Sequence, residues 1–157
     1  FAHVEGWQWR PDLIWFDNLR VVKKCSYHVQ RLFSLNKGTN VLQMKINNRA
    51  ICGKDNSPGL FASAAWDDVN YRFIVKVVNT NEVELRLRLN FDGLEDNVKL
   101  VNGTRIRFHS DDLLAENTLD EPDLVVPVED EIKCDGHLFD VVIGPKSFDI
   151  YKFKKEN

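Results

Sequence analysis

A chain of 157 residues, 43% of them hydrophobic and 29% charged, can bury one core and falls within the usual size of a single domain. Its 24 acidic and 21 basic residues are mixed along the sequence, so there is no basic stripe to bind a phosphate backbone and nucleic acid is not expected as a partner. Charged residues interrupt the apolar runs every few positions, well short of the roughly 18 residues of a membrane helix, so no membrane association is expected.

The first residues are typical of the interior of a longer protein. The chain opens with Phe1-Ala2-His3-Val4 and has neither an initiator Met nor a signal peptide, so we interpret it as a fragment. A signal peptide of the parent would lie outside it, and the sequence leaves the localisation open.

Residues 1–38 predict a loop followed by a helix. Trp7-Gln8-Trp9 precedes Pro11, which disfavours regular structure around it. Ser26 is the expected N-cap, and the apolar side chains that follow have the spacing of one helix face: Val29, Leu32 and Phe33. Asn36-Lys37-Gly38 supplies a cation and a glycine that tolerates the left-handed conformation, which indicates the helix C-terminus.

From Thr39 onward the apolar period changes to two, which predicts antiparallel strands. Leu42, Met44 and Ile46 alternate with polar residues, and residues 60–66 and 71–78 flank a turn at 67–70. The clearest alternation spans residues 83–89, with Val83, Leu85, Leu87 and Leu89 on one face and Glu84, Arg86 and Arg88 on the other. Further strands are expected at 98–101, 104–108, 138–143 and 147–153, separated by turns at Asn102-Gly103, Asp135-Gly136 and Gly144-Pro145. The acidic stretch 110–131 is predicted to be a long surface connection. The expected fold is all-β, an antiparallel sandwich or jelly roll.

Residue types that could carry chemistry are present, but their spacing does not favour it. Asp111-Asp112, Asp67-Asp68 and Glu5 could serve as glycosidase carboxylates by type alone, yet adjacent Asp residues on turns are usually solvated. No metal site is expected, because neither the histidines (His3, His28, His109, His137) nor the cysteines (Cys25, Cys52, Cys134) have ligand spacing. We expect histidines that are either on the surface or satisfied in the core, and free, buried thiols. Asn102-Gly103-Thr104 is a formal glycosylation acceptor, for which a tight turn is a sufficient explanation.

The dense cluster Trp7-Gln8-Trp9 has two interpretations. Aromatic rings pack on the C–H faces of sugars, so the cluster could contact carbohydrate. The rings could equally be buried against the rest of the parent protein. Residue chemistry alone does not decide between them.

Two motifs resemble those of family-51 glycoside hydrolases, the α-L-arabinofuranosidases. They are W-x-P-D-L-I-x-F-D-N at residues 9–18 and Y-x-V-Q-x-L-F at residues 27–33. Residues 60–65, 76–80 and 113–118, together with 145–148 and Tyr151, resemble the C-terminal domain of the same family, so the resemblance covers nearly the whole chain. The chain departs from the pattern at residues 21–25, where a Y-G-T-P run is expected, and at His28, which replaces an aromatic residue.

The resemblance implies a parent with a (β/α)8 barrel that releases terminal α-L-arabinofuranosyl residues from arabinan or arabinoxylan with retention of configuration. Its two catalytic glutamates would precede Phe1, so no catalytic residue is expected in this chain, and no cofactor. Residues 1–38 would be the last barrel loop and closing helix, with Trp9, Trp7 and Gln8 near the substrate, and residues 39–157 the accessory β-sandwich. The expected partners are the catalytic barrel of the same polypeptide, an arabinose-containing saccharide and, since oligomers are common in the family, further copies of the parent. A secreted or periplasmic location is slightly favoured over a cytoplasmic one.

The main alternative is an independent carbohydrate-binding module, because β-sandwiches serve both purposes. A binding module should place its aromatic residues on one exposed face. Here the aromatic residues occupy alternating positions typical of a core: Trp66, Phe73, Phe91, Phe108, Phe148 and Phe153. The pattern therefore favours an accessory domain.

Overall fold

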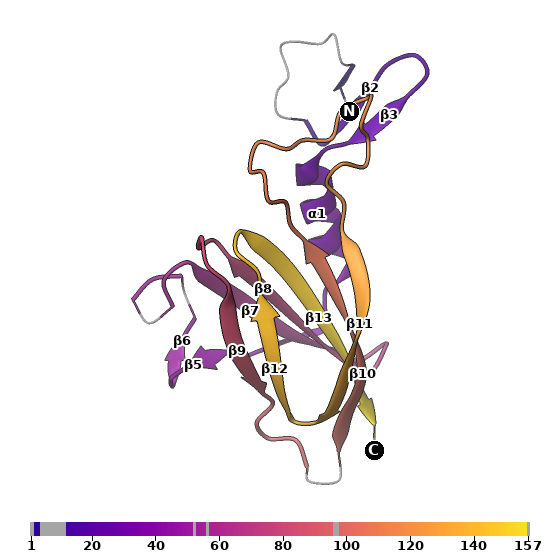
Figure 1. Ribbon diagram of the computed structural model, residues 1–157. Coiled ribbons are helices and arrows are strands. Elements are labelled where there is room, and N and C mark those ends of the chain that lie inside the picture. The colour runs from indigo at the N-terminus through magenta and orange to yellow at the C-terminus, as the bar shows by residue number, and fades with distance from the viewer. Residues whose placement is uncertain (1, 4–11, 52, 56, 96–97, 157) are drawn as a thin grey trace.

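The computed structural model describes residues 2–3, 12–51, 53–55, 57–95 and 98–156, with only the backbone at 2, 3, 102 and 135 (Figure 1). Two sheets face each other in this structure. The larger has six strands in the order β11-β10-β13-β8-β7-β4, all neighbours antiparallel, and the smaller pairs β12 with β9. The predicted antiparallel sandwich is thereby confirmed.

The strands of the large sheet are β4 (Asn40–Leu42), β7 (Leu60–Asp67), β8 (Arg72–Asn79), β10 (Lys99–Phe108), β11 (Val128–Gly136) and β13 (Ser147–Glu156). The small sheet contains β9 (Leu85–Asn90) and β12 (Leu138–Ile143), and β5 (Lys45–Ile46) and β6 (Arg49–Ala50) form a short hairpin. Before the sandwich come β1 (Ala2–His3), β2 (Ile14–Phe16), β3 (Val21–Lys23) and helix α1 (Cys25–Leu35).

The main core lies between the two sheets. Phe153 is fully buried and stacks on Phe139 of the small sheet with ring centroids 5.0 Å apart, and Phe91 meets both rings edge-on. The register predicted for residues 85–89 is correct: the three leucines of β9 pack half-buried against this core, while Arg86 and Arg88 are exposed. Val83 precedes the strand and is 63% exposed, so its predicted place on the apolar face is wrong.

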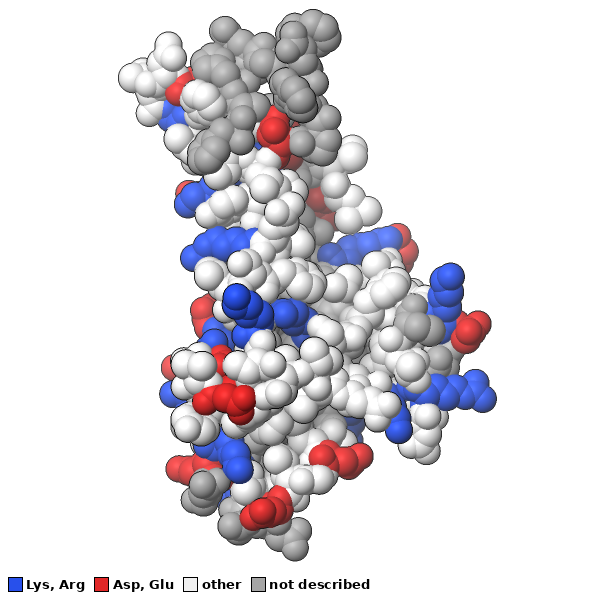
Figure 2. All heavy atoms as spheres, turned by 180° about the vertical axis from the view of Figure 1, so that it is seen from behind, with Lys and Arg blue, Asp and Glu red and all other residues white. Residues whose placement is uncertain are grey.

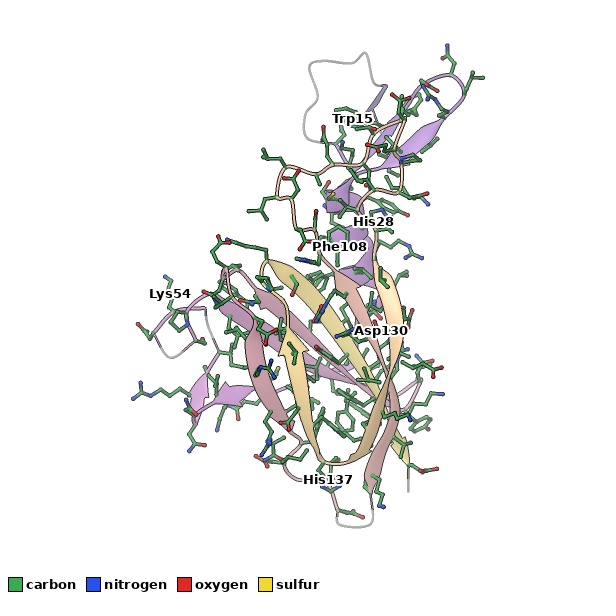
Figure 3. The ribbon with its side chains drawn as sticks, in the orientation of Figure 1. Trp15, His28, Lys54, Phe108, Asp130 and His137 are labelled. Carbon is green, nitrogen blue, oxygen red and sulfur yellow. The ribbon has the colours of Figure 1, made fainter. Side chains whose placement is uncertain are left out.

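Helix α1 covers part of the opposite face of the large sheet. Alternation along the strands turns Ile74, Ile106, Phe148 and Ile150 away from the main core, and Leu32 of α1 packs with them in a second buried cluster. Phe33 stacks on Phe148 at 4.9 Å, and His28 lies beside Phe108 at the end of β10 (Figure 3). On the side of the molecule away from the viewer in Figure 1, both signs of charge are spread over the described surface (Figure 2).

The ends of α1 differ from the prediction. Lys24, and not Ser26, is the N-cap: it is extended, and its carbonyl accepts the Tyr27 N–H at 2.9 Å, so the helix already begins at Cys25. Gly38 does not adopt the left-handed conformation, because its φ is not positive. Glycine is required there by close packing, because a Cβ would lie 2.5 Å from the Trp66 carbonyl oxygen.

Three further expectations about the strands are corrected. Asn102-Gly103 is no turn: the two strands predicted around it form one strand, β10, with a bulge beside Gly103. A Cβ on Gly103 would lie 2.8 Å from Ile132, so neighbouring strands select this glycine. Strand β11 begins at Val128, within the stretch predicted as a connection, and the predicted strand at 42–46 is divided between β4 and β5.

Candidate functional site

The site residues predicted from the sequence, Trp7, Gln8 and Trp9, lie outside the described residues, as does Glu5. The two ends of their stretch are described, and they lie side by side. Strands β1 and β2 pair in parallel, with Ala2 opposite Trp15. Strand β2 then pairs antiparallel with β3, so both ends of the stretch belong to one small sheet.

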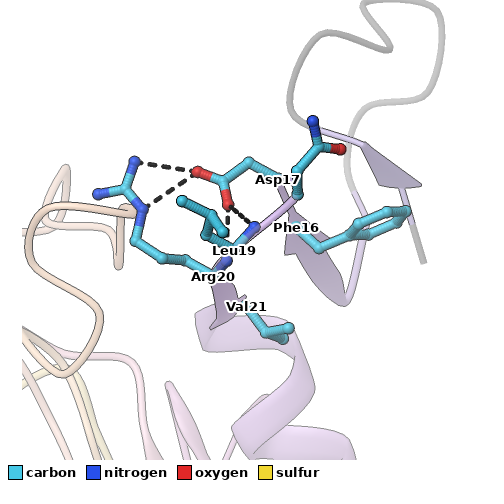
Figure 4. A pocket seen from close by; sticks show the side chains of 6 residues that line it. Phe16, Asp17, Leu19, Arg20 and Val21 are labelled. Carbon is cyan, nitrogen blue, oxygen red and sulfur yellow. Dashed lines mark hydrogen bonds and ion pairs between the residues drawn. The ribbon is translucent and has the colours of Figure 1, made fainter.

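The turn between β2 and β3 borders a hollow of about 440 Å³ lined by residues 16–21 (Figure 4). Oδ1 of Asp17 accepts the backbone N–H groups of Leu19 at 2.8 Å and Arg20 at 2.6 Å, and Oδ2 accepts Nε of Arg20 at 3.1 Å. These donors, the Leu19 N–H first among them, hold the pKa of Asp17 below its ordinary value. A carboxylate kept ionised by its own turn is not poised as a general acid.

The segment between β10 and β11, residues 109–127 (the connecting segment), contacts this N-terminal sheet and so links it to the sandwich. Arg20 donates from one guanidinium nitrogen to Asp120 at 3.1 Å and to the Leu119 carbonyl at 3.3 Å. Lys24, at the start of α1, bonds through Nζ to Glu116 and to the Asn117 carbonyl, both at 2.7 Å. The Lys24 ammonium also lies 4.6 Å from the centre of the Trp15 ring, a cation–π distance.

Asn117 is the centre of the junction between the connecting segment and the N-terminal residues. Its side chain is fully buried; Nδ2 donates to the carbonyls of Lys23 and Val125, each at 2.9 Å, and Oδ1 accepts the Val125 N–H at 2.7 Å. A buried amide with its bonds made in this way fixes two chain segments relative to each other. The connecting segment is therefore partly buried, whereas its acidic composition predicted a surface loop throughout.

The other carboxylates considered from the sequence are engaged in turns and pairs. Donors that stabilise the charged form, first the Asn70 side chain for Asp67 and the Thr39 hydroxyl for Asp68, lower the pKa of each carboxyl. Asp112 caps its own loop, and Asp111 pairs with His109 at 3.0 Å. Acid catalysis needs a raised pKa, which is the opposite of the shift at Asp67 and Asp68.

A buried ion pair in the sandwich is also structural. Asp149 is fully buried and receives two bonds from Arg107, at 2.9 and 2.8 Å, and a third from the Tyr151 hydroxyl at 3.2 Å. Burial, and then the charge of Asp149, raise the pKa of Tyr151. Arg107 also donates to the Val142 carbonyl of β12, which ties the small sheet to the large one.

Among the residues that the structure describes, no three His, Cys, Asp or Glu side chains come together as a candidate metal site. Cys25 is a free, half-buried thiol and Cys134 is half-buried, although buried thiols were expected, and Cys52 lies outside the described residues. No described helix is long and apolar enough to cross a membrane.

Exposed apolar side chains occur on the N-terminal sheet and on the connecting segment, at the same end of the molecule (Figure 1). Leu19 and Leu114 are 93% and 88% exposed, and Val21, Leu113 and Leu124 are exposed as well. Concentrations of this kind are typical of surfaces that another protein part covers.

Comparison with known proteins gives a consistent result. A family model described as the alpha-L-arabinofuranosidase C-terminal domain matches residues 1–147. Alpha-L-arabinofuranosidase 1 of Arabidopsis thaliana is 29% identical over 160 residues, covering 100% of this chain and 23% of that protein. An extracellular exo-alpha-L-arabinofuranosidase of Streptomyces chartreusis is 47% identical over 44 residues, which is 28% of this chain and 5% of that protein. The chain thus spans less than a quarter of the length of these relatives.

Solved structures share the fold. An arabinose-bound GH51 α-L-arabinofuranosidase superposes with a TM-score of 0.83 at 24% identity, over 98% of this chain and 23% of that one. The enzyme of Thermotoga maritima in complex with arabinose gives a TM-score of 0.69 at 20% identity, over 88% and 30%. Fold and sequence matches together define the class, a β-sandwich domain of glycoside hydrolases.

Within that class, the chain belongs to the alpha-L-arabinofuranosidase C-terminal domain family. The family predicted from the motifs at residues 9–18 and 27–33 is confirmed.

Proposed function

We propose that the chain is the non-catalytic C-terminal part of a retaining α-L-arabinofuranosidase that acts on arabinan or arabinoxylan. The family match over residues 1–147 carries this proposal. The described carboxylates support the non-catalytic role, because Asp111 and Asp112 are engaged in local contacts and the pKa values of Asp67 and Asp68 are lowered, whereas an acid catalyst needs a raised one. The two carboxylates of the retaining mechanism would then belong to the catalytic barrel of the same polypeptide.

In this proposal residues 1–38 are the end of the barrel and residues 39–157 the accessory sandwich. The exposed leucines of the N-terminal sheet and connecting segment would be covered by the barrel. Trp9, with Trp7 and Gln8, would lie on the last barrel loop near the arabinose, where active sites of such barrels are built. The extracellular relative from Streptomyces chartreusis favours a secreted location for the parent.

The activity test compares the chain with the full-length enzyme on an aryl α-L-arabinofuranoside. The chain alone should not turn the substrate over, since binding cannot replace the two carboxylates. Turnover above background that disappears on Asp111→Ala would contradict the proposal. If the chain were instead an independent binding module, arabinan in the gel should slow its migration in affinity electrophoresis. The placement of Phe91 and Phe153 in the core argues against this alternative.

The role proposed for Trp9 is tested in the full-length enzyme. Trp9→Ala should lower kcat/KM by about tenfold or more, corresponding to the roughly 1–3 kcal/mol of a lost aromatic contact. Tyr71→Ala, which removes a 69% exposed ring from the sandwich, is the matched control and should keep the full rate. A Trp9 variant with full activity and a melting temperature several degrees lower would make Trp9 a packing residue.

A further inference from the structure

His28 occupies the place where α1, the end of β10 and the connecting segment meet (Figure 3). The residue is only 8% exposed, and its Nε2 has no hydrogen-bond partner among the residues that the structure describes. Its surroundings are aromatic: the ring of Tyr27 meets it edge-on at 5.5 Å, and that of Phe108 lies 6.0 Å away. A neutral imidazole fits such a site, whereas a protonated one would bury an N–H without an acceptor.

The charges around His28 also disfavour its protonation. Burial lowers the pKa of His28 most, followed by the positive charges of Lys23 on β3 and Arg31 on α1, and only Asp123 of the connecting segment acts in the opposite direction. The next histidine, His109, follows Phe108 and pairs with Asp111 at 3.0 Å. With two cations and one carboxylate nearby, the net effect of the surrounding charges disfavours the imidazolium form.

We propose that His28 is an acid-sensitive latch: its protonation loosens the connecting segment from α1. The cost of charging falls on this junction because His28, a residue of α1, packs its ring against Phe108, where β10 ends and the connecting segment begins, and the charge of Asp123 in that segment acts on it. The opened state exposes the imidazole to water, where it takes up its proton at the ordinary value near 6.5. The inference concerns the junction within the chain and does not depend on catalysis elsewhere in the parent.

The direction of the pH effect follows from linkage. A histidine whose pKa is lowered in the closed state contributes stability that is fully present above about pH 6.5, the ordinary value, and is lost as the pH falls toward the lowered one. One proton taken up on opening changes the opening equilibrium by up to about tenfold per pH unit in that window. The connecting segment should therefore open measurably between about pH 6.5 and 5 while the strands of the sandwich stay closed.

Hydrogen–deuterium exchange of the full-length protein tests this directly, with rates corrected for the intrinsic effect of pH. Peptides from residues 110–127 should exchange faster at pH 5 than at pH 6.5, by up to about tenfold per pH unit, and peptides from β8 and β13 should not. His28→Phe keeps a ring in the site and removes the titration, so its connecting segment should show a nearly flat response. His109→Gln, which changes the histidine at the start of the connecting segment and leaves His28 in place, should behave like the unmodified protein.

An unchanged pH response in His28→Phe would overturn the proposal, as would an equal loss of response in His109→Gln. Should the Phe variant fail to fold, deuterium incorporation at the C2 carbon of each histidine in the unmodified protein still decides the matter. A His28 titration midpoint at or above the ordinary value of about 6.5 would refute the latch. None of these measurements reads arabinofuranosidase activity, so they stand apart from a failure of the proposed function.

Discussion

Asn117→Ala removes three hydrogen bonds from the junction between the connecting segment and β3. Their lengths are 2.9, 2.9 and 2.7 Å, and the side chain that makes them is fully buried. The carbonyls of Lys23 and Val125 and the Val125 N–H would lose this partner. At about 1 kcal/mol for each bond, the free energy of unfolding should fall by about 3 kcal/mol. In a domain of this size that corresponds to a decrease of about 6–12 °C in Tm.

Differential scanning calorimetry measures this change, with Asn90→Ala as the matched control. Asn90 is exposed and makes one side-chain bond, to Asp92 at 2.6 Å, so its removal should change the stability by less than about 0.5 kcal/mol. A Tm for Asn117→Ala within about 1 °C of the unmodified protein would refute the reasoning. The junction would then be held by the ion pairs of Lys24 and Arg20, and the buried amide would contribute little.

Two further substitutions test the sandwich itself by urea denaturation. Phe153→Ala should lower the free energy of unfolding by about 3–5 kcal/mol, because Phe153 is fully buried between Phe139 and Phe91. The control Leu138→Ala, at a residue that is 52% exposed, should lower it by less than about 1 kcal/mol. Equal losses in the two variants would mean that the core lies elsewhere. Arg107→Met leaves the buried Asp149 without its cation and should cost about 3–5 kcal/mol. A loss below about 1 kcal/mol would mean that water replaces the guanidinium.

Local patterns in the sequence predict much of the sandwich. The alternation at residues 85–89 fixes the inner face of β9, and the turn residues at 67–70 place the hairpin of β7 and β8 correctly. Strand β11 escapes detection because charged residues such as Glu129 and Glu131 lie on its exposed side at the edge of the sheet. Asn102-Gly103 has the sequence of a turn, and the actual reason for the glycine cannot be seen locally: Gly103 makes room for Ile132, which belongs to another strand.

The junction could not be predicted from local patterns. Asn117 lies in an acidic, turn-rich stretch, and its partner Lys23 is 94 residues away in the sequence. Lys24 likewise reads as an ordinary surface lysine, although its ammonium is held by Glu116 and by a carbonyl of the connecting segment. Such residues are recognisable only once the fold brings the two segments together. The predicted substrate contacts of Trp7, Gln8 and Trp9 stay predictions.

Helix α1 has a consequence for moving this sandwich between enzymes. Leu32 of α1 belongs to the buried cluster on the back of the large sheet, with Ile74, Ile106, Phe148 and Ile150. A gene fusion that starts at Thr39 would leave that cover behind and present these side chains to water, with the aggregation that uncovered apolar sheets invite. A chimera should instead take the helix along with Lys24 and β3. The transplantable unit, and the unit that recombination can exchange without damage, is then larger than the strands alone.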